Sequence, residues 1–267
     1  MSIIGSPFPK NVSIHFTTKA GGVSLPPFAS NNLGLHVEDN AQHVLENRQR
    51  LQQQLAVGSI QWLKQVHGNT AIQAQAEMQS EAADNAHTEA PIADAQFTQQ
   101  TGLACAILTA DCLPVLFAAA DGSQVAAAHA GWRGLAAGVL LSTLNSFPEP
   151  NKVIVCFGAA IGQDAFEVGQ EVKTAFPWAS DKCFRKGLGT KHQANLYQLA
   201  FEQLQKAGVT EIYQAVFNHN NAETVQIKPY QEVTAAEQPC TYTQKELFYS
   251  YRRDQHTGRQ ASLIWKV

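Results

Sequence analysis

The chain has 267 residues, of which 45% are hydrophobic, and its 19 basic and 22 acidic side chains give a net charge of −3. This composition is typical of a globular protein and excludes extensive disorder. Without a basic excess to neutralise phosphates, the chain is not expected to bind nucleic acid. No membrane association is expected either, because Asp111 and Pro114 interrupt its most apolar stretch, residues 103–120, and a spanning helix needs about 18 apolar residues.

The first residues lack the basic and apolar segments of a signal peptide, and the five cysteines show no paired spacing. We therefore expect a cytoplasmic protein with reduced thiols. The sequence does not indicate an oligomeric state.

Short β-rich runs alternate with helical segments, which predicts an α/β or α+β domain. The Asp121-Gly122 pair predicts a hairpin turn between two of the strands. The predicted strands are Val12–Thr17, Ile60–Val66, Leu103–Thr109, Pro114–Ala119, Gln124–His129, Lys152–Phe157, Glu211–Phe217 and Ser262–Lys266.

Capping residues and apolar spacing predict three helices. The first begins after Asn40 and ends near Leu55, the second lies between Gly134 and Pro148, and the third runs from about Asn195 to Gly208. Residues 75–96, with several acids and no base, and residues 218–239 fit neither pattern. We predict that both stretches are surface loops.

Arg48 occupies an unusual position on the first predicted helix. With 100° per residue and Val44 at zero, Leu51 and Leu55 fall within about 20° of Val44, and Arg48 falls at about 40°, inside the apolar stripe. One interpretation is a side chain whose head extends past the edge of the core. The other is a guanidinium held in a pocket, where it can bind a phosphate or carboxylate.

Three candidate metal ligands lie at the ends of predicted strands: His67 in WLKQVHGNT, Cys112 in TADCLPVLFA and His129 in AAAHAGWRG. Two imidazoles and a thiolate suit Zn²⁺, and three protein ligands leave a fourth position open, as in catalytic zinc sites. Copper accepts the same ligands. The residues alone leave two alternatives open: separate structural roles, or a metal-free pair with Cys112 as nucleophile and His129 as base.

The remaining cysteines and histidines carry weaker signals. Cys105 and Cys156 lie inside apolar runs and are predicted to be core residues. His36 follows the NNLG turn and could line a site. His15 is expected at the surface, with most of the other histidines.

Several segments match one family in order along nearly the whole chain: GGVSLPPFASNNLGLH (21–36), NRQRL (47–51), WLKQVHGNT (62–70), TADCLPVLFA (109–118), AAAHAGWRGLAAGV (126–139), GAAIGQDAFEVGQEV (158–172) and CTYTQKELFYSYRRDQHTGRQASLIW (240–265). With these segments the chain resembles the laccase-domain family. Its members were once called multicopper polyphenol oxidases and have since been assigned purine nucleoside phosphorylase activity. Some bacterial members are described as cytoplasmic peptidoglycan-editing factors.

The resemblance implies a fold and a site. The fold is a single α/β domain over residues 1–267, with mixed β-sheets layered between helices. The residues that match the family's zinc ligands are His67, Cys112 and His129, and Arg48 matches an arginine credited with holding phosphate. We expect these four residues to be catalytic. Further substrate contacts within the matching motifs are expected from Asn32, His36 and Arg133.

The implied activity is zinc-dependent phosphorolysis of adenosine, inosine, guanosine or S-methyl-5′-thioadenosine to the free base and ribose 1-phosphate, with adenosine deamination as a second activity. One alternative is a hydrolase of peptide-linked cell-wall precursors that uses Cys112 and His129. Copper-dependent phenol oxidation is another, although the nine histidines include no His-x-His pair. A binding module with a structural zinc is a non-enzymatic alternative.

The chain departs from the family pattern at a few places. Glu38 stands where we expect glycine, and Gln260 stands where methionine is more usual. The segments 75–93 and 214–239 are longer than usual. None of these changes affects the three proposed ligands.

Overall fold

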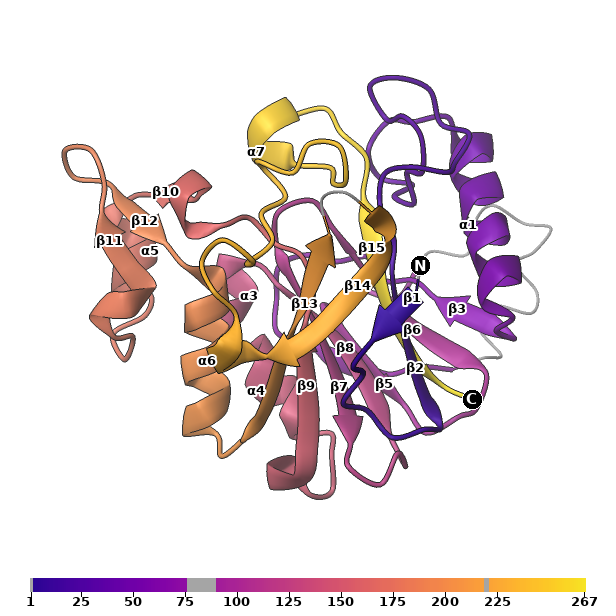
Figure 1. Cartoon of the computed structure of the whole chain (residues 1–267), viewed down its shortest axis with the longest axis horizontal. Helices are drawn as coiled ribbons and strands as arrows, with labels where there is room; N and C mark the ends of the chain where they lie inside the picture. Colours follow the sequence, from indigo (N-terminus) through magenta and orange to yellow (C-terminus); the bar gives the residue numbers. More distant parts are fainter. Residues whose placement is uncertain (1, 76–89, 219–220) are drawn as a thin grey trace.

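A computed structural model describes residues 2–75, 90–218 and 221–267. Its largest sheet has eight strands in the order β1-β14-β13-β9-β7-β8-β5-β4 (Figure 1). The sheet is mixed, since β13 is parallel to β9 whereas β7 is antiparallel to both of its neighbours. Its strands are β1 (Ser2–Ile4), β4 (Ala71–Gln73), β5 (Ala95–Thr98), β7 (Leu113–Ala119), β8 (Val125–Ala130), β9 (Val153–Phe157), β13 (Glu211–Asn218) and β14 (Asn221–Pro229).

A second sheet of four strands packs on one face of the first, in the order β2-β15-β6-β3. Alternation along the strands explains the packing, because successive side chains point to opposite faces. In β7, Leu116 joins the core between the two sheets, whereas Val115 and Phe117 join the core beneath the helices. The four strands are β2 (Val12–Phe16), β3 (Ser59–Gln61), β6 (Leu103–Thr109) and β15 (Gln260–Lys266).

Helices cover the two outer faces of this pair of sheets. The core beneath the eight-stranded sheet includes residues of α3 (Trp132–Ala136), α4 (Val139–Leu144) and α6 (Leu196–Lys206). On the opposite side, α1 (Ala41–Leu55) packs through Leu51 against the outer face of the four-stranded sheet. Figure 1 shows α6 and α1 on opposite sides of the sheets. The predicted α/β fold, with mixed sheets layered between helices, is confirmed.

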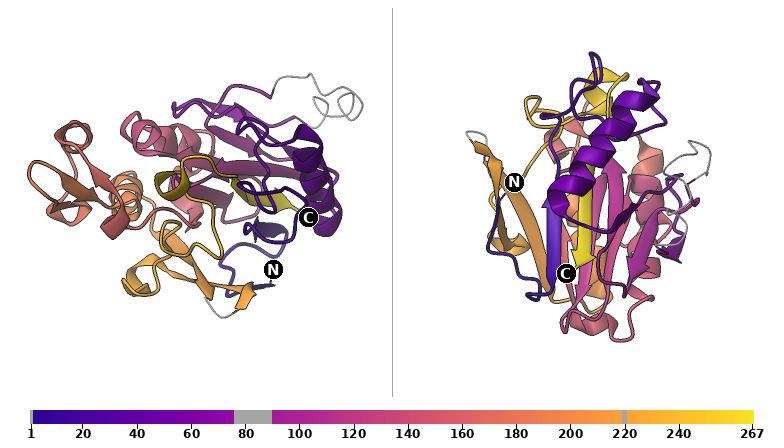
Figure 2. Two further views of the ribbon diagram at one scale, coloured as in Figure 1. Left: turned by 90° about the horizontal axis from the view of Figure 1, so that it is seen from above. Right: turned by 90° about the vertical axis from the view of Figure 1, so that its right-hand side faces the viewer.

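A small three-stranded sheet, ordered β10-β12-β11, projects from the side that carries α6 (Figures 1 and 2). It comprises β10 (Glu167–Val168), β11 (Phe184–Lys186) and β12 (His192–Ala194), and α5 (Gln170–Thr174) packs beside it. Four 3₁₀ turns and a last short helix complete the described elements: η1 (Pro150–Lys152), η2 (Gln163–Ala165), η3 (Asp181–Cys183), η4 (Tyr230–Glu232) and α7 (Tyr251–Asp254).

Local sequence signals predicted several boundaries correctly. The Asn40 side chain accepts a hydrogen bond from the Gln42 amide at the start of α1, and Asn195 caps α6 in the same way. Gly122 has φ +71°, which glycine adopts without strain, and the predicted hairpin joins β7 to β8 there. All five cysteines are free thiols, and Cys105 and Cys156 are fully buried, as expected.

Other predictions were wrong. The second helix starts at Trp132 rather than after Gly134, and it is divided into α3 and α4 at Gly138, which has φ +88°. The strand predicted to reach Val66 ends at Gln61. Part of the supposed loop 218–239 forms β14, which pairs with β13. Most of the loop predicted at 75–96 lies outside the described residues.

His15 is buried in β2 rather than exposed, because strand pairing with β15 encloses it. Across the described residues, no helix combines the length and apolar character needed to cross a bilayer.

Candidate metal centre

Strand pairing brings the three predicted ligands to one end of the eight-stranded sheet. Leu113, which follows Cys112, pairs with Ala130, which follows His129. His67 lies at the same end of the sheet, because β8 pairs with β5, β5 pairs with β4, and β4 begins shortly after His67. Neighbouring strands lie about 4.8 Å apart. Residues far apart in the sequence therefore meet at this sheet end.

The ligand atoms of His67, Cys112 and His129 all lie within 4.8 Å of one another, and Cys112 Sγ is 3.7 Å from His67 Nε2. A tetrahedral zinc with bonds of about 2.0–2.3 Å holds its ligand atoms roughly 3.5 Å apart. The three side chains thus fit one metal ion. They form the only group of three or more His, Cys, Asp or Glu side chains with this proximity among the described residues.

Two glycines after His129 make room for the group. A Cβ on Gly131 would lie 2.8 Å from His67 Cδ2 and 2.9 Å from Cys112 Sγ, closer than side chains tolerate. A Cβ on Gly134 would lie 2.7 Å from the Gly68 carbonyl oxygen. The glycines of HAGWRG therefore allow α3 to approach the ligands.

Asp94 is a site residue that the sequence analysis missed. It was assigned to a surface loop, but it is fully buried and accepts a hydrogen bond from His129 Nδ1 at 2.9 Å. Its carboxylate also accepts the amides of Val66, His67 and Gly68. The available signal was its place directly before an apolar strand, where sheet residues often form sites.

Cys112 and His129 each shift the pKa of the other. Burial raises the pKa of the Cys112 thiol, but the adjacent His129 and His67 outweigh it, so the pKa falls below its ordinary value and favours the thiolate. Burial lowers the pKa of His129, yet Cys112 and Asp94 raise it overall. The thiolate is also the form that ligates metals and attacks as a nucleophile.

Arg48 is half-buried and held against its neighbours, rather than extended freely past the core edge. Its Nε donates to the Leu33 carbonyl at 2.9 Å, and its guanidinium carbon lies 4.2 Å from the ring centre of Trp62. Burial lowers the pKa of Arg48 to about 9, so the side chain stays positively charged at neutral pH. An arginine held in this way is suited to binding an oxyanion.

His36 lies close enough to Arg48 and Arg259 for their charges to act on it. His36 is exposed on one side, yet desolvation by the protein around its ring, followed by Arg259, Arg48 and His129, lowers its pKa to about 4. The imidazole is therefore neutral at physiological pH and can donate one hydrogen bond and accept another. Arg259, which the sequence analysis did not select, is oriented by hydrogen bonds from its Nη1 to the Thr257 and Gly258 carbonyls.

Asn32 does not fit the predicted role of substrate contact, because its side chain is fully buried. Its amide donates to Asp39 and to the Gly34 carbonyl, and its oxygen accepts the amides of Gly34 and Arg259. It therefore shapes the loop before α1. The other predicted contact, Arg133, is exposed on α3 and stacks over Trp132, with 4.4 Å between its guanidinium carbon and the ring centre.

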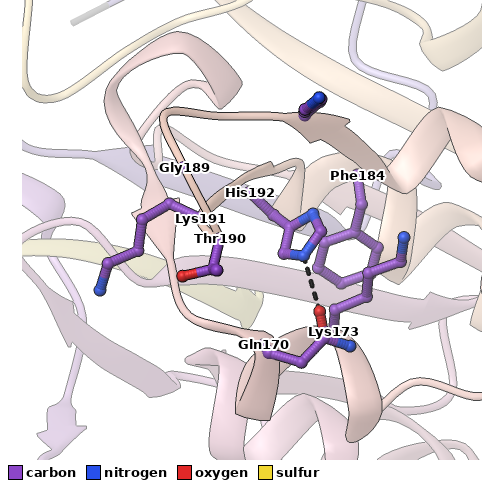
Figure 3. A pocket seen from close by; sticks show the side chains of 8 residues that line it. Gln170, Lys173, Phe184, Gly189, Thr190, Lys191 and His192 are labelled. Atoms are coloured by element: carbon purple, nitrogen blue, oxygen red, sulfur yellow. Dashed lines mark hydrogen bonds between the residues drawn. The ribbon is translucent and has the colours of Figure 1, made fainter.

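A cavity of about 480 Å³ lies apart from these residues, on the small three-stranded sheet (Figure 3). His192 Nε2 lies 2.8 Å from Gln170 Oε1, while Lys173 and Lys191 point to opposite sides of the cavity. No predicted site residue lines it. The lysines do not converge on a common point, so the sheet end with the three ligands is the better candidate site.

Similar proteins identify the family. The sequence profile described as "Multi-copper polyphenol oxidoreductase laccase" matches residues 13–267. This chain belongs to that family. Several of its curated relatives are named as phosphorylases: "Purine nucleoside phosphorylase YfiH" of Escherichia coli is 42% identical, with 98% of this chain and 96% of the relative covered. "Purine nucleoside phosphorylase PA4543" of Pseudomonas aeruginosa is 40% identical, with 97% and 95% covered.

Solved structures agree with this assignment. The Neisseria meningitidis protein NMB0706 superposes with a TM-score of 0.81 at 40% identity, covering 98% of this chain and 97% of that one. YlmD of Geobacillus stearothermophilus gives 0.82 at 31% identity, with 98% and 94% covered. The laccase-like fold of this chain is therefore that of known structures over nearly its full length.

Proposed function

We propose that this protein is a purine nucleoside phosphorylase with zinc held by His67, Cys112 and His129. The observation that carries the proposal is the convergence of these three ligands at one sheet end. The names of the relatives supply the reaction class. A bound zinc would supply a Lewis-acidic centre with one open coordination position.

Phosphate binding is assigned to Arg48. The hydrogen bond to Leu33 uses Nε. Among the described residues, the two terminal nitrogens of Arg48 have no acceptor. They are therefore available for a bidentate contact with phosphate. Trp62 holds the guanidinium plane from one side. In the reaction, a phosphate oxygen forms a bond to C1′ of the ribose while the bond from C1′ to the purine nitrogen breaks. The purine takes up a proton and leaves, and catalysis depends on positioning phosphate against C1′.

The base and ribose are assigned to His36 and Arg133. A neutral His36 can hydrogen-bond a ribose hydroxyl or a purine nitrogen without repelling the positive charge that develops on the sugar. Arg133 lies on the short helix that directly follows the His129 strand. The candidate substrates are adenosine, inosine, guanosine and S-methyl-5′-thioadenosine.

The test is a panel of these nucleosides with purified protein, with and without phosphate, and with separated products. We expect free base and ribose 1-phosphate only when phosphate is present. Release of free ribose would indicate hydrolysis instead, and conversion of adenosine to inosine would indicate deamination. Cys112→Ser should abolish turnover, whereas Cys240→Ser is a matched control, because Cys240 is also half-buried but, within the described part of the chain, its thiol accepts only the Gly162 amide. Intact nucleosides with zinc-loaded wild-type protein would refute the proposal.

One arrangement favours a second candidate, a cysteine hydrolase without metal. Cys112, His129 and Asp94 supply a nucleophile, a base and a carboxylate that orients the base. A peptide-linked cell-wall precursor is the substrate class for this reading. Hydrolysis of such a precursor that persists after complete zinc removal would support the metal-free hydrolase. Loss of all hydrolysis when the zinc is removed would exclude it.

Copper-dependent phenol oxidation, which the family description names, is less compatible with the site. An oxidase of that kind passes electrons between several coppers, whereas the described residues contain a single group suited to one ion. Metal analysis of the native protein that found several coppers per chain would reverse this conclusion.

A further inference from the structure

Asp94 is a buried carboxylate whose surroundings call for an explanation. It is fully buried, and among the described residues its only ion-pair partner is His129. A charged group out of water is costly unless hydrogen bonds replace its hydration. Four N–H groups do so here, and all four belong to the two segments that carry histidine ligands.

Each carboxylate oxygen is shared between donors. Oδ1 accepts His129 Nδ1 at 2.9 Å and the His67 amide at 2.8 Å. Oδ2 accepts the Gly68 amide at 2.7 Å and the Val66 amide at 3.2 Å. One side chain therefore binds the ring of one candidate ligand and the backbone of the other.

The backbone of Asp94 makes the same connection. Its carbonyl accepts the His129 amide at 2.7 Å, and its amide donates to the Thr70 carbonyl at 3.1 Å. Asp94 directly precedes β5, which lies between β8 and β4 in the sheet. It is thus located between the strand of His129 and the turn of His67.

The His67 turn depends on this support. His67 has φ +61°, a left-handed conformation that is strained for a non-glycine residue. In this conformation three successive amides, those of residues 66–68, point at one carboxylate. Without the carboxylate, the turn would lose the bonds that compensate for the strain.

We propose that Asp94 is a positioning residue that sets both histidines for the metal before the metal binds. By accepting from Nδ1, it fixes the His129 ring with Nε2 directed into the site, and by binding the three amides it fixes the place of His67. This rests on the proposed occupancy of the site by zinc. Groups that hold metal-binding histidines in this way typically contribute about 10- to 100-fold to metal affinity.

The test is the zinc affinity of Asp94→Asn, measured by competition with a chelator of known affinity. Asparagine has the same shape but directs an amide nitrogen at one pair of donors, so we expect zinc binding to weaken roughly 10- to 100-fold. Asp121→Asn is the control, because Asp121 also accepts a backbone amide, that of Ser123, but is exposed on the β7–β8 turn. It should bind zinc like the wild type.

Cobalt substitution supplies a readout that a general loss of stability would not change. We expect Asp94→Asn to keep the sulfur-to-cobalt band from Cys112 while its ligand-field bands shift, because the histidines are displaced. A folded Asp94→Asn protein with unchanged zinc affinity and an unchanged cobalt spectrum would overturn the proposal. If that variant does not fold, the same titration on Asp94→Glu, which keeps the charge but changes its reach, should still give weaker binding, and wild-type affinity would overturn the proposal.

These measurements do not depend on turnover. The protein could bind zinc in a way that depends on Asp94 and still leave nucleosides intact. That result would refute the phosphorylase proposal but not the role of Asp94.

Discussion

His129 and His15 are both buried, but they lie in different sheets and in opposite electrostatic surroundings. His129, in the eight-stranded sheet, contacts Asp94 and Cys112, which together raise its pKa despite burial. His15, in the four-stranded sheet, has a pKa lowered to about 4, chiefly by burial. Burial by itself therefore keeps a core histidine neutral. What distinguishes the candidate site is that its buried histidine contacts the ionisable groups Asp94 and Cys112.

The largest expected effect tests this contrast directly. His129→Gln should lower phosphorolysis roughly 10³-fold or more, the scale seen when one member of a concerted catalytic group is removed, and should also abolish tight zinc binding. His15→Gln should leave the specific activity of the folded protein within about 2-fold of wild type, since the four-stranded sheet supplies no proposed ligand. Steady-state kinetics and zinc content of both variants check the prediction. Equal losses of activity in the two variants would show that His129 has no special role compared with His15.

Two arginines on α1 extend the comparison to anion binding. Arg48 is held by Leu33 and Trp62, whereas Arg50 is exposed and pairs with Glu46. Arg48→Lys should raise the KM for phosphate about 10- to 100-fold, because a charged hydrogen bond contributes roughly 1.5–3 kcal/mol and lysine cannot make the bidentate contact. Arg50→Lys should have no measurable effect. An Arg48→Lys enzyme with unchanged KM for phosphate would place the phosphate elsewhere.

Acid stability distinguishes His15 from exposed histidines. Its pKa of about 4 in the folded protein lies below the ordinary 6.5, so the stability linked to neutral His15 is present above pH 6.5 and is lost as the pH falls toward 4. The difference between these two pKa values corresponds to about 3 kcal/mol. Relative to His15→Gln, the wild type should lose about that much unfolding free energy between pH 7 and pH 4, measured by urea denaturation.

The control for this measurement is His256→Gln, because the His256 side chain is 75% exposed. Its unfolding free energy should follow the wild type in parallel across the same pH range. Wild-type and His15→Gln curves that also run in parallel would show that His15 does not titrate in this way.

Local signals predicted the parts of the fold that local chemistry decides. Asn40 and Asn195 indicated the starts of two helices, and the spacing of Val44 and Leu51 placed Arg48 on the apolar stripe of the first. The eight predicted strand positions all contain strands, but the one expected to reach Val66 ends at Gln61. It ends early because the chain must turn toward the site, and Asp94 holds that turn from a distance of 27 positions along the chain.

Non-local pairing explains the errors. Asp94 lies near the end of a segment with several acids, and only its position between β4 and β8 makes it a buried partner of histidines. In the same way, residues 221–229 form strand β14 because they pair with β13, and His15 is buried because β2 pairs with β15. The ligand trio was a candidate from its residue types and its places at strand ends, but its spacing carries no short metal-binding signature, and only the resemblance favoured it over the alternatives. The sheet register supplies the physical reason for its convergence.

The smallest expected effect concerns a second left-handed residue. Glu38 has φ +65°, close to the +61° of His67, but its carboxylate is exposed and lies 3.9 Å from His256 at the surface. A left-handed backbone costs a non-glycine residue roughly 1–2 kcal/mol, and the greater unfolded-state entropy of glycine offsets roughly 0.5–1 kcal/mol of that. Glu38→Gly should therefore raise the unfolding free energy by up to about 1 kcal/mol without changing activity, as measured by urea denaturation and steady-state kinetics. Glu38→Ala removes the same carboxylate but keeps the Cβ, so it should give no such gain; a similar gain from alanine would mean that the charge, and not the backbone conformation, disfavours glutamate at this position.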